Sequence, residues 1–311
     1  MRDNSQRDWS RGEGTARRTH AAVVAERGAR LRHHASSNMP GPLLTLPVHD
    51  ALLEAARLGT TSIECSLDLG RTRTVVNIAA THWTAKDQRY PYLEDCRDRT
   101  VYHWTGTLFE PVARYGTALV KLVPTRWGPP TFEIDGIKML PTAQVSPFDD
   151  ARQKVALIEP AGKQVLDTCG GLGYFAAWCL EGGAAHVLSF EKSPDVLWLR
   201  ALNPWSPASS PRLQLERDDV HERIVALPDR SIDAVLHDPP RFGIAGELYS
   251  AVFYGQLARV LRRRGRLFHY TGTPNRLTTG RDVPREVARR LQDNGFAQVR
   301  IVGDGVLATR A

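Results

Sequence analysis

Four acidic residues in the second half of the sequence each stand at, or shortly after, the end of a short apolar run. They are Asp167, Glu191, Asp219 and Asp238. If these runs are parallel strands, their carboxyl ends meet at one edge of a sheet, which is where open α/β sheets bind ligands. The spacing therefore predicts an acidic pocket, suited to a ligand that carries ammonium and hydroxyl groups.

A glycine-rich turn follows the first of these acids. Gly170, Gly171 and Gly173 allow the backbone to approach a ligand, and the helix predicted after them offers unpaired N–H groups. The spacing differs from the GxGxxG pattern of dinucleotide sites. Asp167 would repel a pyrophosphate, but it suits an ammonium group such as the methionine end of S-adenosylmethionine (SAM). The alternative is a turn that only closes a strand–helix corner.

The next two acids suit the other half of such a ligand. Glu191 comes eighteen residues after Gly173, where a carboxylate can accept hydrogen bonds from both ribose hydroxyls. We assign Asp219 to the adenine amino group. A solvated surface acid is the alternative for Glu191, and a helix N-cap is the alternative for Asp219.

The fourth run ends in Asp238-Pro239-Pro240, our candidate catalytic segment. Two prolines hold the chain extended and remove two N–H donors, so that carbonyl groups and the Asp238 carboxylate face the site. The carboxylate could align an amine or accept its proton. A turn that only reverses the chain is the alternative.

Further residues near the same edge are candidates for contact with an acceptor substrate. They are Arg241, Phe242, His269, Tyr270 and Arg281. His237 is a secondary candidate for proton handling, although such residues are more often packed. The segment 272–282 follows the fifth strand, and we predict that it covers the acceptor as a lid.

The elements that position these residues alternate between apolar runs and helical stretches, which is the pattern of a parallel sheet with crossover helices. We predict parallel strands at 164–167, 186–190, 212–215, 232–237 and 266–270. Helices are expected near 173–181, 194–202, 219–226, 247–262 and 282–294. A hairpin at 298–309 ends the chain. The fold class is thus α/β, a Rossmann-like seven-stranded sheet with an antiparallel terminal hairpin, preceded by a small β-rich domain.

Three regions are expected along the chain: a flexible basic tail at 1–41, a β-rich domain at 42–145 and a SAM-binding domain at 146–311. In the middle region, we expect a helix at 43–58 and strands that include 62–69, 72–79, 100–108, 118–123 and 131–140. Met39 is a candidate initiator, since the composition changes there.

The charge, the cysteines and the apolar runs of the sequence restrict the kinds of partner and site that we expect. The net charge is +7, and eight arginines against four acids fall within residues 1–40, so much of the basic charge belongs to the predicted tail. Arg262–Arg264 precede the fifth strand, and we interpret them as a solvated face that follows a helix end.

The four cysteines form no CxxC pair, which predicts no metal site and a reduced cytoplasmic setting. No apolar run approaches the ~18–20 residues of a membrane span.

The order of these motifs resembles the class I SAM-dependent methyltransferases. More closely, the sequence is similar to a group of predicted methyltransferases known chiefly from archaea, of which some carry spermidine-synthase-like labels. The similarity covers about 43–311 and is carried by segments 167–174, 237–242, 246–250 and 267–272. It implies direct transfer of a sulfonium methyl group to a nucleophile held in line, with Asp238 orienting or deprotonating that nucleophile.

Two positions depart from the general methyltransferase pattern. Cys169 replaces the usual first glycine of the loop, and Arg241 stands where enzymes that methylate base amines carry an aromatic residue. Phe242 comes one residue later. The basic tail, the Asp238-Pro239-Pro240 turn and the added domain favour a methyltransferase that acts on RNA or another nucleic acid. A small-molecule methyltransferase or polyamine aminopropyltransferase, and a non-catalytic relative that binds RNA or a partner, are the alternatives.

Overall fold

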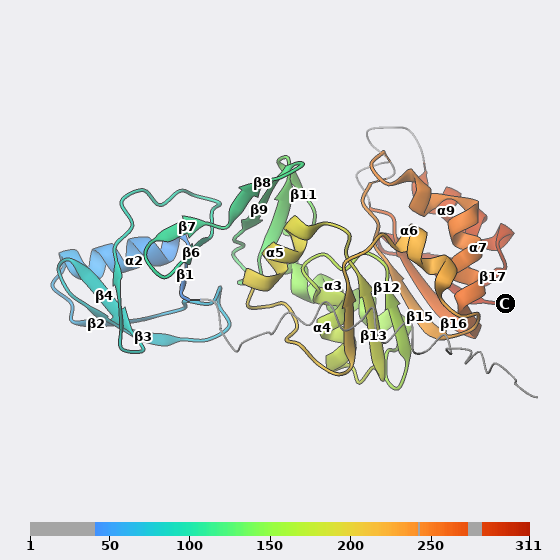
Figure 1. The fold of residues 1–311 in the computed structure, drawn as a ribbon, viewed down its shortest axis with the longest axis horizontal. Helices are drawn as coiled ribbons and strands as arrows, with labels where there is room; N and C mark the ends of the chain where they lie inside the picture. Colours follow the sequence, from blue (N-terminus) through green and yellow to red (C-terminus); the bar gives the residue numbers. More distant parts are fainter. Residues whose placement is uncertain (1–40, 242, 273–281) are drawn as a thin grey trace, which may run out of the picture. The chain divides into compact units, whose positions relative to one another are not determined.

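The computed structural model describes residues 41–241, 243–272 and 282–311. The described residues belong to one compact unit. Figure 1 shows the path of the chain through it. Apart from Gly41, the predicted tail lies outside the described residues, and so does most of the predicted lid. None of the described helices is long and apolar enough to cross a membrane.

Between Leu43 and Lys138, the chain forms one helix and three small antiparallel sheets. The helix, α2, covers Leu46–Arg57. The sheets have the strand orders β1-β6-β7, β2-β3-β4-β5 and β11-β10-β9-β8. Their strands are β1 (Leu43–Leu44), β2 (Ser62–Cys65), β3 (Thr74–Ile78), β4 (His82–Ala85), β5 (Gln88–Pro91), β6 (Tyr102–Trp104), β7 (Phe109–Pro111), β8 (Ala113–Tyr115), β9 (Leu119–Val123), β10 (Thr131–Ile134) and β11 (Ile137–Lys138).

Four predictions in this region need correction. The strand expected over 62–69 ends at Cys65, and the strand expected over 100–108 covers only Tyr102–Trp104. The helix expected from Leu43 begins only at Leu46, because Leu43 and Leu44 pair with β6 as a short strand. Pro47 lies in the first turn of the helix, where its missing N–H costs nothing. The strand expected over 131–140 is divided by a turn at Asp135-Gly136 into the antiparallel pair β10 and β11.

The second half forms a seven-stranded sheet of order β14-β13-β12-β15-β16-β18-β17. Its first five strands are parallel and β18 runs antiparallel to β16, as predicted. The strands are β12 (Gln164–Asp167), β13 (His186–Phe190), β14 (Leu213–Glu216), β15 (Ile232–His237), β16 (Leu261–Tyr270), β17 (Phe296–Val302) and β18 (Gly305–Arg310).

One strand starts earlier than the sequence indicated. β16 begins at Leu261, directly after the preceding helix ends at Val260, so Arg262–Arg264 lie within the strand. The pairing with β15 shifts register here, and Arg264 has a positive φ of 63°. The irregular backbone makes this stretch hard to recognise as strand from its pattern.

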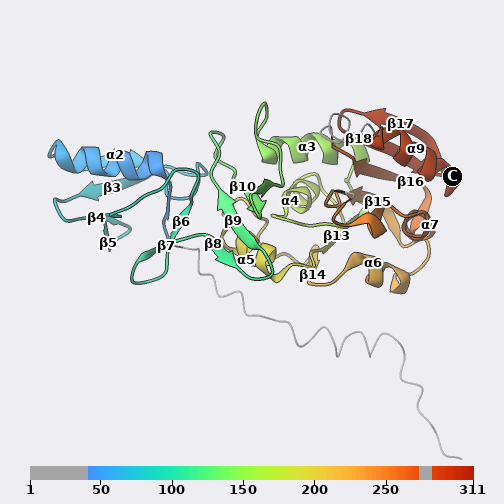
Figure 2. The same ribbon diagram turned by 90° about the horizontal axis from the view of Figure 1, so that it is seen from above.

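Helices cover both faces of this sheet (Figures 1 and 2). Alternate residues of one strand face opposite sides, so Val165 of β12 joins one core and Leu166 joins the other. The first face packs against α3 (Pro147–Ile158), α4 (Tyr174–Glu181) and α5 (Pro194–Leu202). The second packs against α6 (Val220–Arg223), η2 (Ile224–Ala226), η3 (Gly246–Tyr249), α7 (Ala251–Val260) and α9 (Val283–Asp293). Because helices pack on both faces of the sheet, the loops at the carboxyl ends of its parallel strands are held in place.

Candidate active site

Strand register places the predicted acids at one edge of the sheet. Asp167, the last residue of β12, lies between Ser189 of β13 and Leu236 of β15. Glu191 and Asp238 come directly after β13 and β15. Asp219 follows β14 by three residues. All four therefore belong to the carboxyl ends of neighbouring parallel strands.

The turn between β12 and α4 requires its glycines. Gly171 and Gly173 have φ values of 49° and 82°, in the left-handed region that other residues rarely adopt. A Cβ atom on Gly173 would lie 2.6 Å from the guanidinium carbon of Arg200, and one on Gly170 would lie 2.5 Å from Ser189 Oγ. The Gly173 N–H donates to the Gly170 carbonyl at 2.7 Å, which closes the turn.

Asp167 lies beneath this turn and is completely buried. Its Oδ2 accepts a hydrogen bond from the Ser189 hydroxyl at 2.8 Å, while its buried Oδ1 has no hydrogen-bond partner in the described part of the chain. Burial raises the pKa of this carboxyl to about 6, although the Ser189 hydrogen bond and the positive charge of Arg200 oppose the increase. The acid expected to face the ligand is thus enclosed by protein.

Arg200 of α5 was not among the residues singled out from the sequence. Its side chain is 5% exposed, and Nη1 and Nη2 are buried without hydrogen-bond partners among the described residues. Burial lowers its pKa, and the charges of Asp167 and Glu191 act in the opposite direction. A signal existed in the sequence: Arg200 continues the buried i, i+3, i+4 series Val196, Leu199, Arg200 of its helix.

Glu191 is held by two backbone N–H groups. Its Oε2 accepts from Gly171 at 3.0 Å and its Oε1 from Ser193 at 2.9 Å. Burial raises the pKa of Glu191, whereas these hydrogen bonds lower it. The carboxylate therefore ties the glycine turn to the start of α5, and each oxygen keeps a second lone pair for a ligand hydroxyl.

Asp219 forms the helix cap that the sequence offered as its alternative role. Its Oδ1 accepts from the His221 N–H at 2.9 Å at the start of α6. Its Oδ2 lies 3.4 Å from the Lys192 ammonium group. The assignment of Asp219 to an adenine amino group stays a prediction.

Asp238 has no hydrogen-bond partner among the described residues, although it is only partly exposed. Burial raises its pKa to about 6, the charge of Lys154 lowers it and that of Asp150 raises it. Pro239 is buried behind it, and the Tyr249 hydroxyl donates to the Pro240 carbonyl at 3.2 Å. A fixed turn thus presents an unpaired carboxylate.

Two residues of α3 complete this part of the site. Lys154 forms an ion pair of 2.6 Å with Asp150, and its ammonium group lies 3.9 Å from the centre of the Tyr270 ring. The Lys154 side chain is only 9% exposed. Sequence reasoning found Tyr270 but missed Lys154 and Asp150, which show only as an i, i+4 charge pair.

The two histidines at the strand ends belong to the core. His237 Nδ1 lies 2.7 Å from the Thr168 hydroxyl, and its Nε2 lies 3.0 Å from a backbone carbonyl oxygen. Nε2 of His269 lies 2.9 Å from the Tyr254 hydroxyl, and its Nδ1 lies 2.9 Å from the carbonyl of the next residue. Both rings are completely buried, and burial lowers the pKa of His237 to about 4. His269, expected at the acceptor, thus presents no exposed ring nitrogen.

Of the remaining residues predicted to contact an acceptor, only some lie within the described part of the chain. Arg241 is exposed, and its side chain has no hydrogen bond or ion pair with another described residue. Phe242, Arg281 and residues 273–281 of the predicted lid lie outside the described residues.

Strands from the first half of the chain reach the glycine turn. The Tyr174 hydroxyl of α4 donates to the Pro130 carbonyl at 2.8 Å. A Cβ atom on Gly171 would lie 3.8 Å from the ring of Phe132 in β10. The β-rich region therefore forms one wall beside the turn.

Comparisons with known proteins give a relative in sequence and a shared fold. No protein-family profile matches the sequence. The uncharacterized protein MJ1233 of Methanocaldococcus jannaschii is 42% identical over 194 residues, which are 61% of this chain and 66% of that protein. The chain thus aligns with a little under two thirds of the length of that relative.

Among solved structures, a spermidine synthase in complex with the transition state analogue AdoDATO aligns with a TM-score of 0.53 and 17% identity, over 64% of this chain and 73% of that one. The fold is shared with spermidine synthase. A SAM-dependent methyltransferase from Archaeoglobus fulgidus aligns with a TM-score of 0.41 and 13% identity, over 52% of this chain and 92% of that one. Among the described residues, no group of three or more His, Cys, Asp or Glu side chains could hold a metal ion.

Proposed function

We propose that this protein is a SAM-dependent methyltransferase whose donor binds at the carboxyl edge of the seven-stranded sheet. The observation that carries the proposal is the glycine turn with its left-handed φ values, with an enclosed carboxylate beneath it and the Glu191 carboxylate bonded to its Gly171 N–H. A turn of this kind lets a ligand approach the backbone, and the acids around it favour a cationic ligand over a phosphate.

The donor fits the residues in three places. Glu191 has free lone pairs for the ribose hydroxyls. Beyond its cap, Asp219 has a second carboxylate oxygen, which lies 3.4 Å from the Lys192 ammonium group and keeps a lone pair for a ligand amino group. Asp167 contributes negative charge from beneath the turn, where its Oδ1 has no partner among the described residues. We assign two roles to Asp167: it positions the glycine turn, and its negative charge attracts the cationic donor. It makes no direct contact with the donor.

In the transfer step, Asp238 receives the proton. SAM, when bound, supplies a methyl group on a positively charged sulfur. Where the acceptor loses a proton on taking up that methyl group, Asp238 would hold and accept that proton. Because its carboxylate has no partner among the described residues and a pKa of about 6, Asp238 is ionised and free to act near neutral pH.

Aminopropyl transfer is the second candidate, favoured by the fold shared with spermidine synthase. A polyamine acceptor carries several ammonium groups and needs several unpaired acids. Near Asp238, Asp150 is already paired with Lys154. Asp304, whose charge acts on Tyr270 together with that of Asp238, also has no side-chain partner among the described residues. Two unpaired carboxylates are fewer than a polyamine with several ammonium groups needs, so methyl transfer is our choice.

Replacement of Glu191 by alanine tests the donor site. We expect SAM to bind more weakly by roughly 2–4 kcal/mol, on the scale of lost hydrogen bonds to a charged group. Isothermal titration calorimetry measures the dissociation constant. Glu191→Gln keeps the size of the side chain and should give a smaller loss, while Glu222→Gln, an exposed acid on α6, should change nothing. Unchanged affinity in Glu191→Ala removes the ribose assignment.

The acceptor can be found with extract from cells that lack this protein. The extract is incubated with the protein and either SAM labelled in the methyl group or decarboxylated SAM labelled in the aminopropyl group. Methyl label that enters RNA, protein or small molecules identifies the acceptor class. Label that is transferred only from decarboxylated SAM would overturn the methyltransferase proposal.

A further inference from the structure

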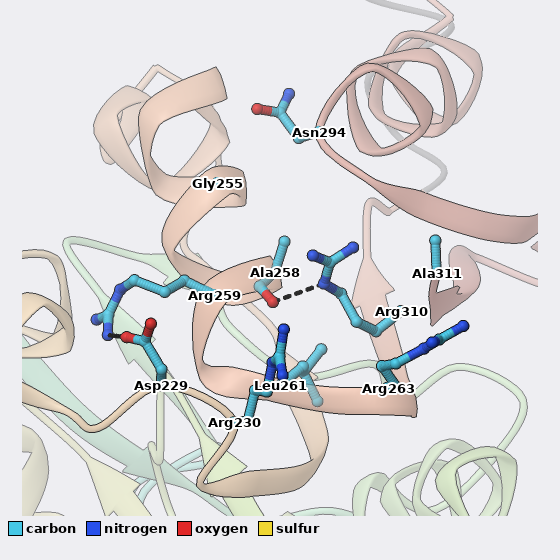
Figure 3. A pocket seen from close by; sticks show the side chains of 10 residues that line it. All are labelled: Asp229, Arg230, Gly255, Ala258, Arg259, Leu261, Arg263, Asn294, Arg310 and Ala311. Carbon is cyan, nitrogen blue, oxygen red and sulfur yellow. Dashed lines mark hydrogen bonds and ion pairs between the residues drawn. The ribbon is translucent and has the colours of Figure 1, made fainter.

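A hollow lies at the opposite edge of the sheet from the candidate active site. It encloses about 380 Å³ and is lined from the turn before β15, from α7, from the start of β16 and from the end of β18 (Figure 3). Arg230, Arg259, Arg263 and Arg310 line it, and Asp229 is its one acidic side chain. Because these residues lie at the amino ends of the parallel strands, the hollow is separate from the candidate active site.

Positive charge in this hollow is only partly neutralised. Arg259 is bound to Asp229 at 2.5 Å and to backbone carbonyls. Arg310 donates from Nε to the Ala258 carbonyl at 2.8 Å and from Nη1 to the Gly295 carbonyl at 2.6 Å. The side chains of Arg230 and Arg263 have no hydrogen bond or ion pair within the described ranges. Three guanidinium groups of the hollow, those of Arg230, Arg263 and Arg310, therefore form no ion pair with a carboxylate of the described residues.

Neighbouring arginines outside the hollow behave differently. Arg262 is paired with Asp233 and Arg266 with Glu159, each at 2.6 Å. Arg264 is exposed and unpaired within the described part of the chain, and adds to the local charge. An arginine-rich surface that served only solubility would not need to gather unpaired guanidinium groups around a concavity, because like charges repel and a concave wall strengthens their field.

Arginine side chains in a concave site match a phosphate group. The planar guanidinium presents two parallel N–H donors to phosphate oxygens, and Arg310 is already held in place by its two carbonyl contacts. Figure 3 shows Arg230 and Arg310 reaching into the space beside Ala258. The volume of 380 Å³ lies at the small end of ligand sites, roughly 300–1,000 Å³. The size favours a small molecule over a polymer.

We propose that this hollow binds the phosphate group of a small phosphorylated molecule, at a site distinct from the one proposed for SAM. Arg230 and Arg263 supply the free donors, and Arg310 supplies a fixed one. The proposal does not depend on the methyltransferase assignment.

Calorimetric titration with inorganic pyrophosphate tests the site, with protein that carries no tag at its C-terminus. We expect saturable 1:1 binding in the wild type, weakened tenfold or more in the double variant Arg230→Gln, Arg263→Gln. Arg300→Gln, an exposed arginine of β17 outside the hollow, is the matched control and should stay within twofold of wild type. Thermal unfolding and SAM titration of the same variants should be unchanged.

Three results would overturn the proposal. The first is an absence of saturable pyrophosphate binding to the wild type. The second is equal affinity in wild type and double variant. The third comes from single-stranded RNA with a 5′-hydroxyl: if RNA binds with a steep salt dependence that the double variant loses, while pyrophosphate does not bind, the hollow serves a polymer backbone instead.

Discussion

Asp238→Asn is expected to lower the rate of group transfer about 10²–10⁴-fold, the usual contribution of a positioned general base. The amide keeps the size of the side chain but cannot accept a proton. The wild-type carboxylate has no hydrogen-bond partner among the described residues, so the substitution leaves no packed neighbour without its bond. SAM affinity should change little, because the predicted donor contacts lie elsewhere.

The pH profile gives this prediction a second readout. The pKa of Asp238 is raised to about 6, so the wild-type rate should increase as the pH passes through about 6 and the carboxyl loses its proton. The rate of Asp238→Asn should not show this increase near pH 6. Transfer of labelled methyl groups into extract from cells lacking the protein measures both, with Glu222→Gln as the control. An Asp238→Asn enzyme with the wild-type rate and profile would contradict the role of this residue.

Arg200→Met is expected to destabilise the fold by about 3–5 kcal/mol at pH 8, the usual cost of removing one partner from a buried group of charges. Asp167 would lose the cation that favours its charged form. Its pKa of about 6 in the folded protein means that it is ionised at pH 8 and largely protonated at pH 5. The missing cation should therefore matter less at pH 5 than at pH 8.

Urea unfolding at the two pH values measures this effect. Arg217→Met, at an exposed arginine after β14, is the matched control and should alter stability within about 0.5 kcal/mol. If Arg200→Met is as stable as wild type at pH 8, or loses the same free energy at both pH values, then Arg200 does not act through the charge of Asp167.

The strands that carry the site could be predicted from sequence because burial on both faces leaves a clear pattern. β12, β13 and β15 begin and end where the apolar runs of the sequence do, so the positions of Asp167, Glu191 and Asp238 at the carboxyl edge followed directly. The antiparallel terminal hairpin could also be predicted, because the glycine-containing turn at 303–305 separates two apolar runs.

The partners of those acids could not be found in this way. Arg200 and Lys154 come from helices, and which helix face meets which acid is decided by packing between segments far apart in the chain. The same is true of His269, which looks available at the end of its strand until the Tyr254 hydroxyl of α7 is placed against its ring. Local sequence patterns predicted the positions of the acids at the strand ends, whereas their charge states depend on tertiary contacts.

Calorimetric titration of the wild-type protein with SAM tests the central claim most directly. We expect one donor to bind per chain, with a dissociation constant of about 1–100 μM, which corresponds to a binding free energy of roughly −8.2 to −5.5 kcal/mol. Glu191→Ala should weaken that binding, whereas the double variant Arg230→Gln, Arg263→Gln should retain it. A wild-type protein that binds neither SAM nor decarboxylated SAM at millimolar concentration would contradict the donor site and the transferase assignment that depends on it.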